Sequence, residues 1–393
     1  MSREVVVVSG VRTAIGDYGG ALKDLAPTEL AARVAREAVA RAKINPNDVG
    51  HVVFGNVIHT EPKDMYLSRV AMINGGLAQH TPAMTLNRLC GSGMQAIVSA
   101  AQTILLGDAD IALAGGAESM SRAGYLLPTM RWGQRMGDAS AVDMLVGALN
   151  DPFDTVHMGV TAENIAAKWA ITRGQQDEFA VESHRRAVNA IQKGHFREQI
   201  LPIELKTRKG VTVFDTDEHP RADASMEGMA KLKAVFQKDG TVTAGNASGI
   251  NDAAAAVVLM EAGVAAKKGL KPMARLVAYG HAGVDPKFMG IGPVPAVKAA
   301  LARAGLKVSD MDVIESNEAF AAQACAVARD LQFDPAKTNP NGGAIALGHP
   351  VGATGCLITV KALYELQRSG GRYALVTMCI GGGQGIAAVF ERM

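Results

Sequence analysis

The feature that most constrains the fold is an internal repeat in a chain of 393 residues. Three residues recur at a constant offset of 262 positions, so that Arg41, Asp48 and Val52 correspond to Arg303, Asp310 and Ile314. Each set lies where an expected helix gives way to a following strand. Residues 111–116 and 374–383 also correspond loosely, each as a predicted strand that ends in a glycine turn. Such a repeat predicts two similar halves that pack together.

Strand and helix patterns alternate on both sides of a less regular central segment. Buried strands are predicted at residues 4–9, 51–57 and 110–115, and helices at residues 28–43 and 91–107. This alternation is typical of an α/β fold.

The segment from about residue 121 to residue 249 is interpreted as an insertion. It contains both tryptophans and irregular polar stretches. Thr172 and Gln175 form a capping-box pattern that opens a helix, which Gly194 could close. Alternation returns after Asn251. We therefore expect three parts: residues 1–120 together with 250–270, the inserted residues 121–249, and residues 271–393.

Composition excludes several classes of protein. Apolar residues make up 48% and charged residues 20% of the chain, so sizeable cores can form and disorder is not expected. The formal net charge is +2, which gives no indication of binding to nucleic acid or to an anionic membrane. No stretch reaches 18 uninterrupted apolar residues, so no membrane span is expected.

Targeting patterns and cysteine spacing favour a cytoplasmic protein without a metal. The apolar run at residues 5–8 is too short for a signal-peptide core, and the last three residues carry no peroxisomal address. None of the four cysteines lies in a C-x-x-C pair, so neither a zinc site nor a thioredoxin-like motif is indicated. In a reducing cytosol these cysteines are expected to be free thiols.

Cys90 is the first candidate for chemistry. A helix is expected to begin just after it, and the positive end of a helix dipole lowers the pKa of a thiol and favours thiolate. Gly91 and Gly93 would leave the sulfur approachable. The alternative is that Cys90 is a small buried apolar residue. The flanking glycines favour a nucleophile.

His349 lies between Gly348 and Pro350 in a glycine-rich loop before an expected helix. Most lone histidines serve packing or lie at the surface. The small residues around this one indicate instead that a ligand approaches it closely.

Cys379 ends an apolar strand and precedes three glycines, and another strand follows at once. Backbone N–H groups in such a turn suit an oxyanion hole, although a plain hairpin turn needs glycine too. Asn317, at a strand-to-helix junction, would by itself be an ordinary helix cap. Cys325 and Cys356 fall inside helical patterns and are interpreted as packing residues.

Four motifs together resemble the thiolase family over essentially the whole chain. They begin at Cys90 (Cys-Gly-Ser-Gly), Asn317 (Asn-Glu-Ala-Phe-Ala), Gly348 (Gly-His-Pro) and Cys379 (Cys-Ile-Gly-Gly-Gly-Gln-Gly), and they occur in the family's order and spacing. The likeness is strongest to short-chain biosynthetic thiolases, including β-ketothiolases that supply polyhydroxyalkanoate synthesis.

The resemblance implies a five-layered α/β/α/β/α fold built from two similar five-stranded βαβαβαββ halves. The insertion would be a loop domain that covers coenzyme A and carries a tetramerisation loop around residues 125–144, giving a homotetramer built as a dimer of dimers. The substrates would be acyl-CoA and free CoA, with no bound cofactor.

The resemblance also implies roles for individual residues. Cys90 would carry the acyl group, His349 would activate it, and Cys379 would move the proton on the α-carbon. Asn317 would hold a water that forms one oxyanion hole with His349, and the N–H groups of Cys90 and Gly381 would form the other. The remaining substrate and coenzyme residues would be His157, Met158, Ala244, Gly245, Ser248, Arg221, Leu149, Phe236, Met289, Ala319 and Phe320.

The expected reaction is a reversible Claisen condensation of two acyl-CoA molecules to a 3-ketoacyl-CoA and CoA. Three alternatives remain open at this level. One is another condensing enzyme of the same fold, such as a ketoacyl synthase, although the glycine turn after Cys379 argues against it. A second is a thiolase-like protein that binds lipid without catalysis, and a third is a hydrolase in which water resolves the acyl-enzyme.

Overall fold

The computed structural model describes residues 3–207 and 210–393. The strands of the N-terminal half are β1 (Val5–Thr13), β3 (His51–Gly55), β4 (Ala83–Leu86), β5 (Ile111–Ser119) and β11 (Asn251–Glu261). Its helices are α1 (Pro27–Ala42), α2 (Leu67–Asn74), α3 (Ser92–Leu106) and α8 (Ala262–Lys267). β11 lies between β1 and β5 although it follows the insertion in sequence.

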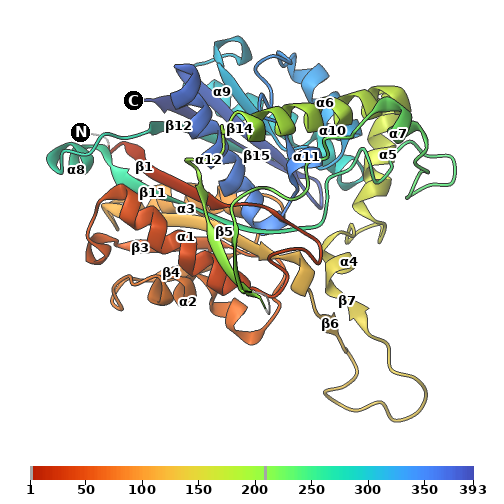
Figure 1. Ribbon diagram of the computed structural model, residues 1–393, viewed down its shortest axis with the longest axis horizontal. Coiled ribbons are helices and arrows are strands. Elements are labelled where there is room, and N and C mark those ends of the chain that lie inside the picture. The colour runs from red at the N-terminus through yellow and green to blue at the C-terminus, as the bar shows by residue number, and fades with distance from the viewer. Residues whose placement is uncertain (1–2, 208–209) are drawn as a thin grey trace.

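The C-terminal half repeats this plan. Its strands are β12 (Ala274–Gly283), β13 (Val313–Ser316), β14 (Tyr373–Ile380) and β15 (Gln384–Arg392). Its helices are α9 (Pro293–Ala304), α10 (Ala321–Leu331), α11 (Ala344–Leu347) and α12 (Val351–Ser369). Figure 1 shows this blue half above the red and orange N-terminal half.

Helices alternate with the two half-sheets to give the five expected layers. α3 and α12 contact each other and strands of both halves, so they form the central layer. α1 and α2 cover the N-terminal half-sheet from outside, and α9 covers the C-terminal one, with α10 packed against α9. Within the described residues, the half-sheets pair with each other only where Val6 and Val7 of β1 lie opposite Arg275 and Ala274 of β12.

The apolar character of α3 follows from this central position. The segment Leu89–Leu106 is long and apolar enough to cross a bilayer by length and hydropathy alone. In the fold, Met94, Ile97 and Val98 are fully buried. A helix that is apolar on most sides is typical of the core of a large domain, so packing accounts for its composition.

The internal repeat is confirmed, down to the strand register. In both halves a helix, a single 3₁₀ turn and a strand follow one another: α1, Pro46–Asp48 and β3 match α9, Val308–Asp310 and β13. Val52 pairs with Leu113 in parallel, and Ile314 pairs with Leu375, so the offset of 262 holds for both partners. A bulge also recurs at equivalent places. In β1 it lies between Val7 and Ser9, opposite β11, and in β12 it lies between Leu276 and Ala278, opposite β15. Shared irregularities are strong evidence of one structural unit used twice.

Two details of the sequence prediction are wrong. The chain does not turn at Gly115 and Gly116, because β5 continues to Ser119. These glycines serve close packing instead: an added Cβ at Gly116 would lie 2.3 Å from the carbonyl oxygen of Gly352. In addition, the described C-terminal half-sheet has four named strands rather than five, and a single bridge between Ile314 and Thr338 replaces the fifth.

The inserted residues form the long helix α6, several shorter elements and two projections. The elements are β6 (Tyr125–Leu126), β7 (Val142–Asp143), α4 (Met144–Ala148), α5 (Met158–Lys168), α6 (Arg173–Gln192), β8 (Ile200–Leu201), β9 (Ile203–Thr207), β10 (Gly210–Phe214) and α7 (Met226–Ala230). The capping box at the start of α6 is confirmed, with Thr172 Oγ1 accepting from Gln175 N at 3.2 Å. Gly194 follows the end of α6 at φ +72°, as expected for a helix terminator.

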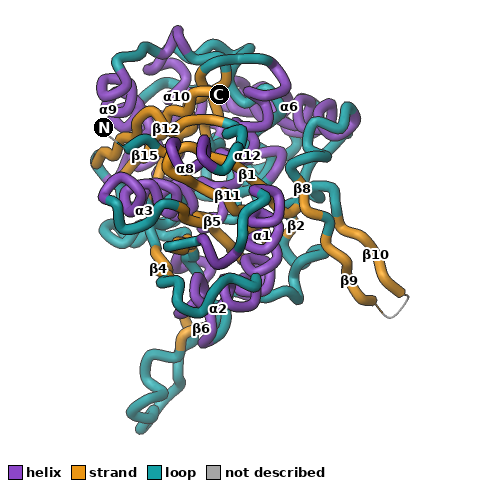
Figure 2. Tube along the Cα trace, turned by 90° about the vertical axis from the view of Figure 1, so that its left-hand side faces the viewer, coloured by secondary structure: helices purple, strands orange, loops and turns teal. Residues whose placement is uncertain are grey.

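The insertion is anchored to the N-terminal half by one buried ion pair. Arg12 on β1 forms a bidentate contact with Asp217, at 2.7 and 2.9 Å. Arg12 Nε also donates to Gln199 Oε1 at 2.8 Å. Figure 2 shows the β9–β10 hairpin and the loop between β6 and β7 extending away from the body.

Candidate active site

Cys90 lies in a tight turn between β4 and α3. Leu89, just before it, has φ +44°, which is uncommon for a residue other than glycine. The Ser92 hydroxyl holds this turn, since it donates to Leu89 O at 2.7 Å and accepts from Arg88 N at 2.8 Å. Gly91 packs closely against Ile380: an added Cβ would lie 2.6 Å from the terminal methyl of that side chain, which would have to move.

The thiol of Cys90 is protonated at rest. Burial raises its pKa to about 11, and the buried carboxyl of Glu118 adds to the rise. The N–H groups of Gly381 and of Cys90 itself point at the sulfur and oppose this rise without cancelling it. The sequence led us to expect a pKa below the usual value, and the pKa lies above it, because desolvation of the thiolate outweighs the backbone N–H groups. A base is needed to generate the nucleophile.

His349 is buried in the hydrogen-bonding state of a base. The Thr354 hydroxyl donates to Pro350 O at 2.9 Å, so its oxygen accepts from His349 Nδ1 at 2.7 Å. Nδ1 therefore carries the proton, and Nε2 presents a lone pair. Burial lowers the pKa of His349 to about 4, which keeps the ring neutral near pH 7. Its backbone N–H donates to Asn251 Oδ1 at 2.9 Å.

Asn317 lies beside this free nitrogen. Its Nδ2 is 3.4 Å from His349 Nε2, and its backbone N–H donates to Thr377 O at 3.0 Å. Asn317 Oδ1 is buried and has no hydrogen-bond partner within the described parts of the chain. A buried amide oxygen of this kind requires a partner such as an ordered water.

Cys379 is the penultimate residue of β14. Burial raises the pKa of its thiol, and the proximity of Cys90 raises it further. Gly382 and Gly383 adopt φ of +78° and +84° in the turn to β15, which glycine permits at no steric cost. That turn aims the Gly381 N–H at Cys90.

The three predicted catalytic side chains border one small cavity of about 50 Å³. Its lining includes Cys90, His349, Cys379 and Gly381, together with Leu149, His157, Met158, Ser248, Met289, Ala319 and Phe320. An outer pocket of about 460 Å³ shares His349, Leu149, His157, Ser248 and Phe320 with it, and adds Arg221, Phe236 and Ala244. The shared residues define one route from the surface to the cysteines.

The predicted coenzyme residues are brought together with one exception. The His157 ring stacks on Phe236 with centroids 4.6 Å apart, and its Nδ1 accepts from Gly159 N at 3.0 Å. Gly245 lines neither pocket, because it packs against Met229 and Leu232 near α7.

Sequence reasoning missed Asp17, Tyr18 and His219, which also line the outer pocket. Asp17 lies on β2 (Gly16–Asp17), which pairs with β11, and its carboxylate contacts His219 Nδ1 at 2.5 Å. These residues are 202 positions apart and neither has a motif around it. Long-range contacts bring Asp17 to the pocket: β2 pairs with β11, and Asp17 N donates to Glu218 Oε2 at 2.8 Å.

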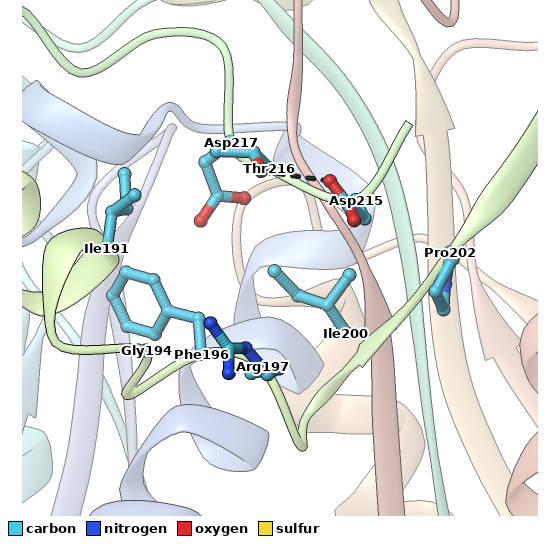
Figure 3. Close-up of a pocket in the computed structure, with 9 residues that line it drawn as sticks. All are labelled: Ile191, Gly194, Phe196, Arg197, Ile200, Pro202, Asp215, Thr216 and Asp217. Carbon is cyan, nitrogen blue, oxygen red and sulfur yellow. Dashed lines mark hydrogen bonds between the residues drawn. The ribbon is translucent and has the colours of Figure 1, made fainter. Parts of the chain in front are cut away.

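A separate pocket of about 190 Å³ lies beyond the end of α6 (Figure 3). None of its nine labelled residues is a cysteine or a histidine. Its Phe196 packs under the Arg12 guanidinium, 5.0 Å from the ring centroid, and Asp217 is the buried ion-pair partner of Arg12. The pocket is built around the contact that anchors the insertion.

Comparison with known proteins identifies the family. The model of the thiolase N-terminal domain matches residues 5–263, and that of the thiolase C-terminal domain matches residues 270–392. The chain is 71% identical to beta-ketothiolase BktB of Cupriavidus necator and 49% identical to an acetyl-CoA acetyltransferase of Syntrophomonas wolfei, with 100% of both chains covered in each case. The chain belongs to the thiolase family.

Solved structures agree with this membership. Human mitochondrial 3-ketoacyl-CoA thiolase in complex with CoA superimposes with a TM-score of 0.97 at 45% identity, covering 100% of this chain and 98% of that one. The acetyl-CoA acetyltransferase of Bacillus anthracis gives a TM-score of 0.97 at 46% identity, covering 100% and 99%. The five-layered α/β fold is thus the thiolase fold.

Proposed function

We propose that this thiolase-family acyltransferase joins acetyl-CoA to acetyl-CoA or another short acyl-CoA, reversibly, through an acyl group on Cys90. The observation that carries the proposal is the single cavity bordered by Cys90, His349, Cys379 and the Gly381 turn. It supplies a nucleophile, a neutral base, a second thiol and backbone N–H donors in one desolvated space. A ketoacyl synthase-like site has no counterpart to the second cysteine and its turn.

In the first half-reaction, the Cys90 proton moves to His349 Nε2 and the thiolate attacks the thioester carbon. The departing CoA thiolate takes the proton of Cys379. This leaves an acyl-Cys90, a Cys379 thiolate and an imidazolium. The N–H groups of Cys90 and Gly381, which point at the sulfur in the free enzyme, are placed to hold the carbonyl oxygen of the acyl group.

In the second half-reaction, the Cys379 thiolate removes an α-proton from the next acyl-CoA. The enolate oxygen would be held by the His349 imidazolium and by a water on Asn317 Oδ1, the buried oxygen without a partner. The carbanion attacks the acyl carbon, and the tetrahedral oxyanion collapses to expel the Cys90 thiolate. His349 then returns its proton to Cys90, so the ionisable groups end as they began.

Thiolysis of acetoacetyl-CoA tests the activity directly. Absorbance of acetoacetyl-CoA should fall only after free CoA is added. The same fall should occur when CoA is added together with EDTA, because the proposed steps use no metal. The five-carbon homologue should react too. A hydrolase would consume the substrate without CoA, and a lipid-binding protein would consume none. A preference for long chains over both substrates would contradict the short-chain assignment.

We further propose that the chain assembles as a homotetramer through the loop between β6 and β7. This loop extends from the body (Figure 1), and Trp132 and Met136 on it are each 89% exposed. Apolar side chains gathered on one projecting segment are costly in water and mark a surface that a partner covers.

Light scattering of a loop variant tests this assembly. Trp132→Ser combined with Met136→Ser should reduce the tetramer to a dimer at micromolar concentration. The control is Val211→Ser with Val213→Ser on β10, which are 59% and 58% exposed on the other projection and should leave the tetramer intact. A wild-type monomer across micromolar concentrations would contradict the proposal.

A further inference from the structure

Glu118, the penultimate residue of β5, is a fully buried carboxylate that the mechanism above does not use. Its Oε1 accepts from Asn56 Nδ2 at 3.0 Å and Ile58 N at 3.1 Å. Its Oε2 accepts from Val57 N at 3.1 Å and Gly352 N at 2.8 Å. All four contacts are donors, so they leave no acceptor for a carboxyl proton.

The two indications of its ionisation differ. Burial raises the pKa of Glu118 to about 8, in spite of the N–H donors. The donor set, however, satisfies only the charged form, because a carboxyl O–H would have to face an N–H group. The four donors therefore stabilise the carboxylate form of Glu118 against the cost of its burial.

Glu118 links the N-terminal half to the first turn of α12. Gly352 is the second residue of that helix, and an added Cβ there would lie 2.4 Å from Glu118 Oε2. Thr354, two residues further on, is the group that fixes the proton of His349 on Nδ1. An anion at the N-terminus of a long helix is also favoured by the helix dipole. The carboxylate thus fixes the helical turn that sets the hydrogen bonding of the base.

The same carboxylate holds part of the wall of the acyl site. Val57 and Ile58, which donate their N–H groups to Glu118, pack in one apolar cluster with Cys90, Leu149 and Val351. Among the described residues, Asp64, in the 3₁₀ turn Pro62–Tyr66, acts on Glu118, and Glu118 acts on Cys90. The Cys379 thiol also lies near Cys90, and the neutral His349 ring borders the same cavity. Glu118 therefore anchors this wall and is also an anion that acts on the Cys90 thiol.

We propose that Glu118 is a positioning residue that holds His349, through Gly352 and Thr354, in register with Cys90. The proposal rests on the proposed function for its effect on turnover. Its effect on the Cys90 thiol can be measured without turnover, so failure of the two ideas is distinguishable.

Glu118→Gln is the test. The amide removes the charge and sets an NH₂ group against N–H donors. We expect kcat for thiolysis to fall about 10²-fold, as a small misplacement of a catalytic group can cause, with little change in KM for CoA. Loss of the neighbouring anion favours the thiolate, so the midpoint of Cys90 alkylation by iodoacetamide against pH should move to lower pH.

Glu315→Gln is the matched control. Glu315 is a buried carboxylate that contacts Lys361 Nζ at 2.9 Å in the C-terminal half. Its loss should lower Tm but leave the alkylation midpoint unchanged. Thr354→Val should reproduce the fall in kcat without the shift in midpoint, and its combination with Glu118→Gln should cost less than the product of the two losses. If Glu118→Gln does not fold, Gly352→Ala should displace the carboxylate and give the same fall in kcat.

Unchanged kcat and midpoint in Glu118→Gln would overturn the proposal. The proposal would also be overturned if the fall in kcat of the double variant equalled the product of the falls in Glu118→Gln and Thr354→Val. If wild-type enzyme shows no thiolysis but the midpoint still shifts in Glu118→Gln, the proposed function fails and the link between Glu118 and Cys90 stands.

Discussion

Cys379→Ala is expected to take an acetyl group from acetyl-CoA onto Cys90 and to proceed no further. Thiolate formation at Cys90 needs His349, whose Nε2 is unprotonated, and the acyl oxygen needs only the N–H groups of Cys90 and Gly381. Without Cys379, the departing CoA thiolate takes its proton from the His349 imidazolium formed in the same step. Removal of the α-proton has then lost its base, which typically costs on the order of 10²–10⁴-fold. Condensation and α-proton exchange should fall by that factor or more.

Mass spectrometry of the acetylated enzyme and NMR of deuterium uptake at the α-carbon measure these two outcomes separately. Cys325→Ala is the control, since Cys325 lies on α10 and does not line the small cavity, and it should keep both activities. Normal proton exchange in Cys379→Ala would show that another group is the base.

Cys90→Ala should show the opposite pattern, with acylation lost and α-proton exchange retained. Without the nucleophile no acyl-enzyme forms, and turnover should fall on the order of 10⁴-fold or more, as when other covalent nucleophiles are removed. Cys379, His349 and Asn317 remain, and they are the groups assigned to enolate formation. The variant should therefore still exchange the α-proton of bound acetyl-CoA, but more slowly than wild-type enzyme. Burial raises the pKa of the Cys379 thiol, and without acylation no departing CoA thiolate removes its proton.

The site of the adduct decides between the two cysteines. In wild-type enzyme, digestion after incubation with acetyl-CoA should place the acetyl group on the peptide that contains Cys90. An adduct on Cys379 would reverse the assigned roles. Loss of exchange in a folded Cys90→Ala variant would mean that the thiol takes part in enolate formation as well.

Local sequence was sufficient for the residues whose neighbours are glycines. Gly91, Gly348 and Gly381 mark places where backbone or side chains come too close for a Cβ, and Cys90, His349 and Cys379 lie beside them. The repeat could be found from the sequence because the half-sheets keep the same register.

Burial and long-range contacts could not be found in this way. The pKa of Cys90 depends on how completely the fold removes it from water, and a helix start in the sequence says nothing of that. Asp17 and His219 meet through long-range contacts: β2 pairs with β11, and the neighbouring Glu218 bonds the backbone of Ile15 and Asp17. Gly115 and Gly116 resembled a turn because tight packing and a turn both require glycine, and only the neighbouring chain distinguishes the two.

The position of β11 has a consequence for synthesis on the ribosome. β11 separates β1 from β5, yet about 130 residues of insertion precede it after β5 ends. At about 5–20 residues per second, the N-terminal half waits roughly 7–26 s for the strand that joins β1 to β5. During that time the open edges of β1 and β5 are templates for wrong pairing. A nascent chain of this protein is thus most exposed to aggregation in mid-translation, when its first half is already made but cannot yet close.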